Sequence, residues 1–121
     1  MITPQQKKAR MRRKCDKMLQ EIGRTMYNKC LVCGKPMSCF HHYYCKSSCS
    51  ALRYDFQNLI PICQGCHLQL HTGNPAIQNA INRIKGKEWL EELEAKKRNL
   101  TVSTTLGYYK NIEEQLLKLI N

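Results

Sequence analysis

The sequence predicts an α+β fold, in which a small centre of two short strands and a short helix is flanked by longer helices. Three observations lead to this fold class. Apolar residues recur at helical spacing on both sides of the centre, whereas the centre itself is irregular with short β-like segments. Seven of the eight cysteines and all four histidines lie within residues 30–74. At 121 residues the core is modest, so a structural metal would add useful stability.

We expect three segments along the chain: a basic N-terminal helix at 1–28, a metal-braced core at 29–74 and a helical region at 75–121. Residues 4–27 contain no internal proline and carry a narrow apolar stripe, which is typical of a helix with one buried face. The stripe consists of Met11, Cys15, Met18, Leu19 and Ile22.

The remaining elements follow from local signals. Short strands are expected at Phe40–Tyr44 and Asn58–Ile62. Asn74 and Pro75 form a helix start, with an N-cap residue before a proline at the first helical position, and Gly86 is expected to end that helix. Either an ordinary core or a homodimer face explains the apolar stripes of the C-terminal helices. These stripes are Ile77, Ile81 and Ile84, then Trp89, Leu90 and Leu93, then Tyr109, Ile112, Leu116 and Ile120.

The net charge of +11 is concentrated at the N-terminus. Residues 1–35 contain ten Lys or Arg and two acids, a net of +8, which leaves +3 for the rest. This asymmetry favours contact with a polyanion, most simply the phosphates of a nucleic acid, although a solvated basic helix would carry the same charge. Charge alone does not distinguish DNA from RNA. The candidate phosphate contacts are Lys7, Lys8, Arg10, Arg12, Arg13, Lys14 and Lys17.

The chain has neither an apolar run of about 18 residues nor the apolar stretch of a signal peptide. We therefore expect a cytoplasmic protein in a reducing environment, where eight cysteines favour metal ligation over disulfides.

Four cysteines form two matched pairs, Cys30 with Cys33 and Cys63 with Cys66. Two CxxC turns are typical of a tetrahedral thiolate zinc site, and because four protein ligands leave no open position, the expected zinc is structural. The other cysteines lack paired spacing. They are explained as small packing residues or, for three of them with a histidine, as a second zinc site; the spacing favours packing. These residues are Cys15, Cys39, Cys45 and Cys49.

The histidines form a second constellation. His67 and His71 are four residues apart in a segment of helical character, so both rings lie on one face and are suited to one divalent metal. His41 and His42 lie on the preceding strand, and Asn58 begins the next one.

These residues resemble the HNH, or ββα-metal, nuclease motif. The matching stretches are "FHHYY", "QNLIPIC" and "CQGCHLQLH", within residues 30–71. The resemblance implies a ββα-metal core braced by the two CxxC pairs and a metal-dependent endonuclease that hydrolyses phosphodiester bonds.

The family's roles carry over as follows. His41, His67 and His71 would hold the metal, His42 would be the general base, and Asn58 would orient His42 by a hydrogen bond. Because neighbours on a regular strand point to opposite faces, the roles of His41 and His42 could be exchanged. Histidine ligands favour Zn²⁺, Ni²⁺ or Mn²⁺, while Mg²⁺ prefers oxygen but is abundant in cells. Arg53 is either a phosphate clamp or a surface arginine.

A narrower resemblance extends over most of residues 30–120. "SALRYDFQN", the following CxxC, "GN" and "AINRIKG" are similar to the phage NinG/Rap recombination nucleases. It implies a structure-specific enzyme for branched DNA such as D-loops and Holliday junctions, in the host cytoplasm. His67 stands where the narrower family carries asparagine, and so agrees with the broader HNH pattern.

Two alternatives remain at this point. The protein could be a non-catalytic zinc module that binds DNA, or a restriction-like or homing nuclease. The N-terminal helix could contact DNA through its cations, or pack on the core or on a second subunit through Met11, Cys15, Met18 and Ile22.

Overall fold

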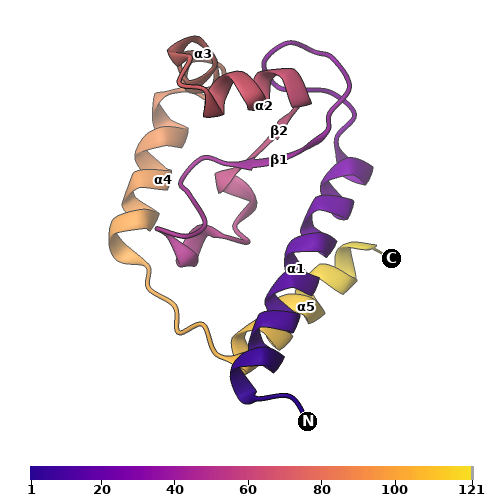
Figure 1. Cartoon of the computed structure of the whole chain (residues 1–121). Helices are drawn as coiled ribbons and strands as arrows, with labels where there is room; N and C mark the ends of the chain where they lie inside the picture. Colours follow the sequence, from indigo (N-terminus) through magenta and orange to yellow (C-terminus); the bar gives the residue numbers. More distant parts are fainter. Residues whose placement is uncertain (121) are drawn as a thin grey trace.

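The computed structural model describes residues 1–120 and is α+β, with five helices and one two-stranded sheet in that range. In Figure 1, α1 and α5 lie side by side along one flank, α4 lies along the opposite flank, and the sheet lies between them. In chain order the elements are α1 (Pro4–Met26), β1 (Cys39–His42), η1 (Ser50–Leu52), η2 (Phe56–Asn58), β2 (Leu59–Ile62), α2 (Gln64–His71), α3 (Pro75–Lys85), α4 (Lys87–Asn99) and α5 (Leu106–Ile120).

The two strands pair antiparallel, with His41 opposite Ile60 and His42 opposite Leu59. All four residues of β2 are buried, so this strand forms the centre of the molecule. β1 ends at His42, two residues earlier than predicted. The amide side chain of Asn58 explains the early end, because its Oδ1 accepts the hydrogen bond of the Tyr44 N–H at 2.8 Å and so replaces a strand partner.

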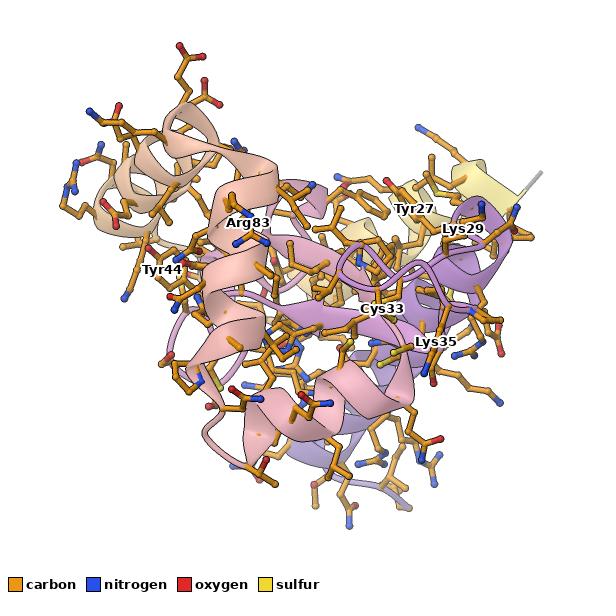
Figure 2. The ribbon with its side chains drawn as sticks, turned by 90° about the horizontal axis from the view of Figure 1, so that it is seen from above. Tyr27, Lys29, Cys33, Lys35, Tyr44 and Arg83 are labelled. Carbon is orange, nitrogen blue, oxygen red and sulfur yellow. The ribbon has the colours of Figure 1, made fainter. Side chains whose placement is uncertain are left out.

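The molecule has two distinct flanks around this sheet. Figure 2 views it from above: Tyr27, Lys29 and Lys35 lie on one side of the view, and Tyr44 and Arg83 on the other. The side with Tyr27 includes the loop between α1 and β1. The loop between α1 and β1 therefore lies on one side of the sheet in this view, and α3, which carries Arg83, lies toward the other.

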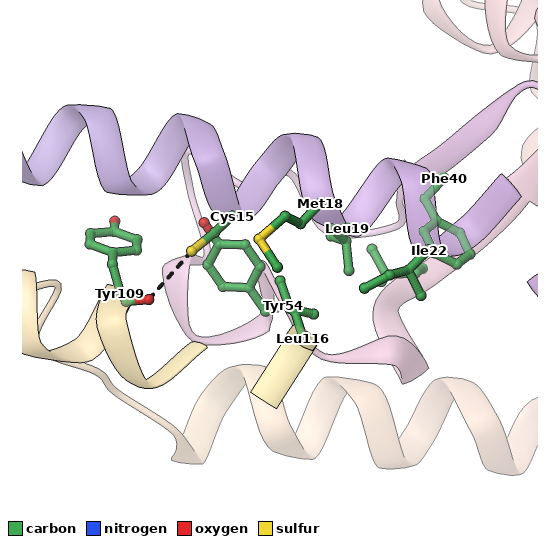
Figure 3. Close-up of a cluster of buried hydrophobic side chains, with 9 residues drawn as sticks. Cys15, Met18, Leu19, Ile22, Phe40, Tyr54, Tyr109 and Leu116 are labelled. Carbon is green, nitrogen blue, oxygen red and sulfur yellow. Dashed lines mark hydrogen bonds between the residues drawn. The ribbon is translucent and has the colours of Figure 1, made fainter. Parts of the chain in front are cut away.

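α1 begins at an N-cap, Thr3, whose side chain accepts the N–H of Gln6 while the Gln6 side chain accepts the N–H of Thr3. This reciprocal capping, with Pro4 next, defines the helix start. The predicted apolar stripe is buried against α5, as Figure 3 shows. Of the alternatives for this helix, the structure shows packing on the core, and contact of its exposed cations with DNA stays a prediction. The buried residues include Cys15, Met18, Leu19 and Ile22 from α1, Tyr109 and Leu116 from α5, and Phe40 and Tyr54.

The C-terminal half of α1 is also fixed to β1. The Gln20 amide donates to the Phe40 carbonyl at 3.2 Å and accepts the Phe40 N–H at 2.7 Å. At Gly23 an added Cβ would lie 2.6 Å from a Phe40 ring carbon, so only glycine permits this close approach. β1 is thus held between β2 and α1.

The predicted start and end of α3 are confirmed. The Asn74 side chain accepts the N–H of Ala76, and Gly86 ends the helix with a φ of 93°. Two positions of the predicted apolar stripes do not lie in the core of the chain: Ile84 is 46% exposed and Ile120 is 54% exposed. Both lie in the last turns of their helices.

None of the helices within residues 1–120 has the length and hydropathy needed to cross a bilayer.

Candidate active site

The two CxxC pairs come together at the end of the hairpin. Cys30 and Cys33 lie in the loop before β1, Cys63 follows β2 as the N-cap of α2, and Cys66 lies in the first turn of that helix. Their four sulfur atoms all lie within 4.8 Å of one another. The four cysteines are therefore positioned to bind one metal ion, as the spacing predicted.

The backbone around these sulfurs suits thiolates. Gly34 has a φ of 77°, which lets its N–H turn back to the Cys30 carbonyl at 3.0 Å. The Cys66 N–H donates to the Cys63 sulfur at 3.4 Å. Burial alone would raise the pKa of the Cys30 thiol, but hydrogen bonds from backbone groups at Cys33, Cys63 and Val32 lower this pKa to about 7. An all-sulfur site with such donors fits Zn²⁺.

Three histidines form a second cluster. His41 comes from β1, and His67 and His71 come from one face of α2. One ring nitrogen from each lies within 4.8 Å of the others, and the Nε2 atoms of His67 and His71 are 2.9 Å apart. The structure thus places His41, rather than His42, with the two helical histidines.

A cavity of about 300 Å³ opens over this cluster. Burial, followed by the neighbouring histidines, lowers the pKa of His41 to about 4. Burial also lowers the pKa of His67. His41 and His67 are therefore neutral at neutral pH, which is the form that ligates metals. Three clustered imidazoles fit one divalent ion. The residues lining the cavity are Gln20, Cys39, Phe40, His41, His42, Cys45, Lys46, His67 and His71.

His42 lines the same cavity but has different partners. Its Nε2 lies 2.9 Å from the carbonyl oxygen of Arg53. Because a carbonyl only accepts, Nε2 carries the proton and the neutral ring is left with Nδ1 as an acceptor. Burial lowers the pKa of His42, with Lys46 also lowering it, although the Arg53 carbonyl opposes the shift. A neutral imidazole with one nitrogen held and one free is suited to accept a proton.

Asn58 does not form the predicted hydrogen bond to His42 among the described residues. Its fully buried Nδ2 donates instead to the carbonyls of Tyr44, at 3.1 Å, and Leu52, at 3.2 Å. The physical reason is that the buried Asn58 side chain packs against the loop between β1 and β2. Its amide forms the hydrogen bonds that polar backbone groups of this loop need. Since Leu52 directly precedes Arg53, Asn58 acts on His42 only through the backbone that supplies the Arg53 carbonyl.

Arg53 is neither a free phosphate clamp nor an ordinary surface arginine. Its Nε donates to Asp16 at 2.9 Å, and its side chain is only 15% exposed. Tyr54 also donates to Asp16, at 2.8 Å. This network ties the loop between the strands to α1, so the guanidinium of Arg53 is already engaged.

The candidate phosphate contacts on α1 are not equivalent. Lys14 pairs with Glu113 of α5. Lys7, Arg10, Arg13 and Lys17 are exposed, and Lys8 and Arg12 are partly exposed.

Three cations of α1 recur at helical spacing with Gln20, which lines the histidine cavity. Arg13 lies seven residues before Gln20, Lys17 three residues before it and Arg24 four residues after it. Arg24 and the cavity-lining Lys46 were not among the residues predicted from the sequence, because charge alone does not reveal which side of the helix meets the cavity.

The unpaired cysteines do not form a second thiolate site within residues 1–120. Cys15 and Cys49 are buried in separate apolar clusters, as the packing hypothesis predicted. Cys45 is exposed and hydrogen-bonds Ser47, so it does not pack. Cys39 has a more specific place, because its sulfur lies 3.5 Å from Nδ1 of His67.

No family model, curated protein or solved structure was found to match the chain. The likeness to HNH nucleases therefore remains a resemblance carried by the motifs, beside the geometry of the two clusters.

Proposed function

We propose that this protein is a metal-dependent DNA endonuclease of the HNH type. One observation carries the proposal: three imidazoles from β1 and α2 converge in a cavity that His42 also lines. A structural protein has no need for a three-histidine ligand set beside a four-cysteine cluster. A metal-dependent hydrolase needs a metal site with a base next to it.

The residues have separate tasks in this proposal. His41, His67 and His71 hold a divalent ion, which supplies Lewis-acid stabilisation of charge on the phosphate and the leaving oxygen. His42 accepts a proton from the attacking water at Nδ1, while the Arg53 carbonyl holds its Nε2–H. Asn58 keeps that carbonyl in place through the loop.

The four-cysteine cluster serves a different purpose. Cys63 and Cys66 begin α2, the helix that carries His67 and His71, and Cys30 and Cys33 precede β1, which carries His41. A structural zinc there would fix the helix and the strand relative to each other. The three imidazoles would then be preorganised before the catalytic ion binds.

DNA reaches the cavity along one side of α1 in this proposal. Arg13, Lys17 and Arg24 lie on the side marked by Gln20, and Lys46 lines the cavity itself. Such cations supply affinity through phosphates without reading bases. Branched DNA in phage recombination is the proposed substrate, on the strength of the narrower resemblance, and it places the enzyme in the host cytoplasm.

Two rival functions make different predictions. A non-catalytic zinc module would bind DNA and leave it intact with every divalent ion. A restriction-like or homing nuclease would cleave linear duplexes at defined sequences and would not prefer a branch.

The decisive experiment incubates the full chain with linear, nicked, forked and four-way DNA of equal length. Each substrate is tested with chelator and with Mg²⁺, Mn²⁺, Ni²⁺ or Zn²⁺. Cleavage that needs a divalent ion and is fastest on forked or four-way DNA supports the proposal. Intact DNA under all conditions would refute the enzyme assignment, and equal cleavage of all shapes would refute branch specificity.

A further inference from the structure

A second cationic hollow lies at the end of the molecule where α1 and α5 begin. The two helices run parallel: Cys15 donates to the Tyr109 carbonyl at 3.3 Å and Lys14 pairs with Glu113, while Leu116 packs further along α1 (Figure 3). Both helices therefore start at the same end of the molecule, as Figure 1 shows.

Two adjoining cavities open at this end, with volumes of about 290 and 410 Å³, and Lys7 and Leu106 line both. Within residues 1–120, only Lys14 of their charged residues has an acidic partner. Neither helix has an acid in its first turn, so the positive ends of both helix dipoles add to the field of the side chains. The charged residues of the lining are all cations: Lys7, Lys8, Arg10, Lys14 and Lys110.

The rest of the lining is largely aliphatic. Ile2, Met11 and Leu106 line the smaller cavity, and Pro4 extends the apolar surface into the larger one. No aromatic side chain lines either cavity, so stacking of unpaired bases has no platform here. Phosphate contacts alone need no apolar floor. The hollow thus combines cations with an aliphatic surface. A ligand that carries carboxylates next to an apolar side chain complements both features.

This hollow is separate from the histidine cavity. Lys7, Arg10 and Lys14 lie roughly 80–140° around α1 from Gln20, at about 100° per residue. Gln20 contacts β1 and lines the histidine cavity, whereas these three cations line the hollow. An occupant of the hollow would leave the histidine cavity open.

We propose that this hollow binds an acidic peptide segment of a partner protein. Its carboxylates pair with the cations, and an apolar side chain rests on Ile2, Met11 and Leu106. This interaction is independent of the nuclease proposal, because none of its contacts involves the histidines or the cysteine pairs.

The test uses a short fluorescein-labelled peptide of glutamates and leucines, with fluorescence anisotropy of the full chain as the readout. Two further probes have similar negative charge: the same peptide with serine in place of leucine, and an oligothymidylate strand. One variant, Lys7→Glu with Lys110→Glu, reverses charge in the hollow. A second, Leu106→Ser, removes part of its apolar surface. Arg13→Glu with Lys17→Glu is the matched control, since it makes the same charge change outside the hollow.

We expect the leucine peptide to bind best, and both hollow variants to weaken it by about tenfold or more. The control variant should change binding much less, and thermal melts should show that every variant is folded. Absence of peptide binding would overturn the proposal. Equal binding of the serine peptide, oligothymidylate binding that the hollow variants weaken as much as they weaken peptide binding, or equal weakening by both charge reversals would also overturn it, by showing a non-specific or nucleic-acid surface.

Discussion

His41 and His42 are neighbours in the chain, yet their side chains have different surroundings. His41 lies with His67 and His71, whereas Nε2 of His42 is held by the Arg53 carbonyl. β1 ends at His42, so the second ring is not confined to the opposite face of a continuing strand. This end of the strand lets two adjacent imidazoles line one cavity with separate partners.

His42→Ala should lower the cleavage rate by about 10²–10⁴-fold, because it removes a general base. DNA affinity should stay near that of the wild type, since His42 is not among the cations that meet phosphates. Single-turnover cleavage and anisotropy on the same substrate would measure both quantities. His41→Ala serves as the comparison, because it should also lower the affinity for the divalent ion. Cleavage by His42→Ala at the wild-type rate would contradict the assignment.

The pH dependence of cleavage should reflect the lowered pKa of His42. The base works only when neutral, so the rate should fall as the pH falls through this pKa. Because burial lowers the pKa, the acid midpoint should lie below the unperturbed value of about 6.5. Single-turnover rates at saturating metal, measured from neutral to acid pH, would test this. A midpoint above that value would show that another group limits the rate.

Cys39→Ala should weaken binding of the divalent ion by about 10–100-fold, the usual cost of losing a partner behind a histidine ligand. The Cys39 sulfur lies 3.5 Å from Nδ1 of His67, while Nε2 of His67 faces His71. Calorimetric titration of Co²⁺, with the cysteine cluster already filled by zinc, would measure the change. Cys45→Ala is the control, because Cys45 lines the cavity without contacting His67. An equal effect of the two variants would exclude a specific role for Cys39.

At the scale of elements, the four-cysteine cluster joins the hairpin to α2. β1 and β2 have four residues each, and α2 has eight, so each is too short to be stable alone. The sulfurs join the loop before β1 to the start of α2. A metal there would supply much of the stability that the short elements lack.

Cys63→Ser should therefore disrupt folding as well as metal binding, because zinc–thiolate free energy is largely folding free energy. Elemental analysis of the wild type should find about one tightly held zinc per chain from this site. Cys45→Ser, which changes an exposed cysteine outside both clusters, should keep the zinc and the thermal stability. A metal-free wild type that is fully folded would contradict this prediction.

At the scale of the whole molecule, α1 is both a core helix and a charged surface. Leu19 and Ile22 are almost fully buried, and each contributes about 1.5–3 kcal/mol. A domain has only about 5–15 kcal/mol of total stability. Removing the helix would therefore destabilise the fold, so its charges have to be tested by substitution.

Replacing Arg13, Lys17 and Arg24 together with glutamine should weaken binding to all DNA shapes alike, since phosphate contacts carry no base readout. The slope of log affinity against log salt should become shallower by roughly 0.9 for each lost contact. Salt titrations with thermal melts would measure this in folded protein. Glutamine at Lys87, an exposed cation on α4, is the control. An unchanged slope would mean that this side of α1 does not touch DNA.

The sequence by itself determined most of the elements of this protein and the residues of its cysteine and histidine clusters. The capped start at Asn74, the end at Gly86 and the paired spacing of the cysteines are local signals, because neighbours in the chain decide cap geometry and turn shape. The histidine pair on α2 is equally local, since helical spacing alone puts both rings on one face.

Only the tertiary structure decided the partners of these side chains. In the tertiary structure His42 contacts the Arg53 carbonyl and not Asn58, and the Arg53 side chain donates to Asp16. The sulfur of Cys39 lies next to Nδ1 of His67. Each contact joins elements that are distant in the chain, and residue type and spacing do not specify which groups meet across such distances. Packing of α1 against both β1 and α5 brings these elements together, and so it determines how the side chains around the cavity are oriented.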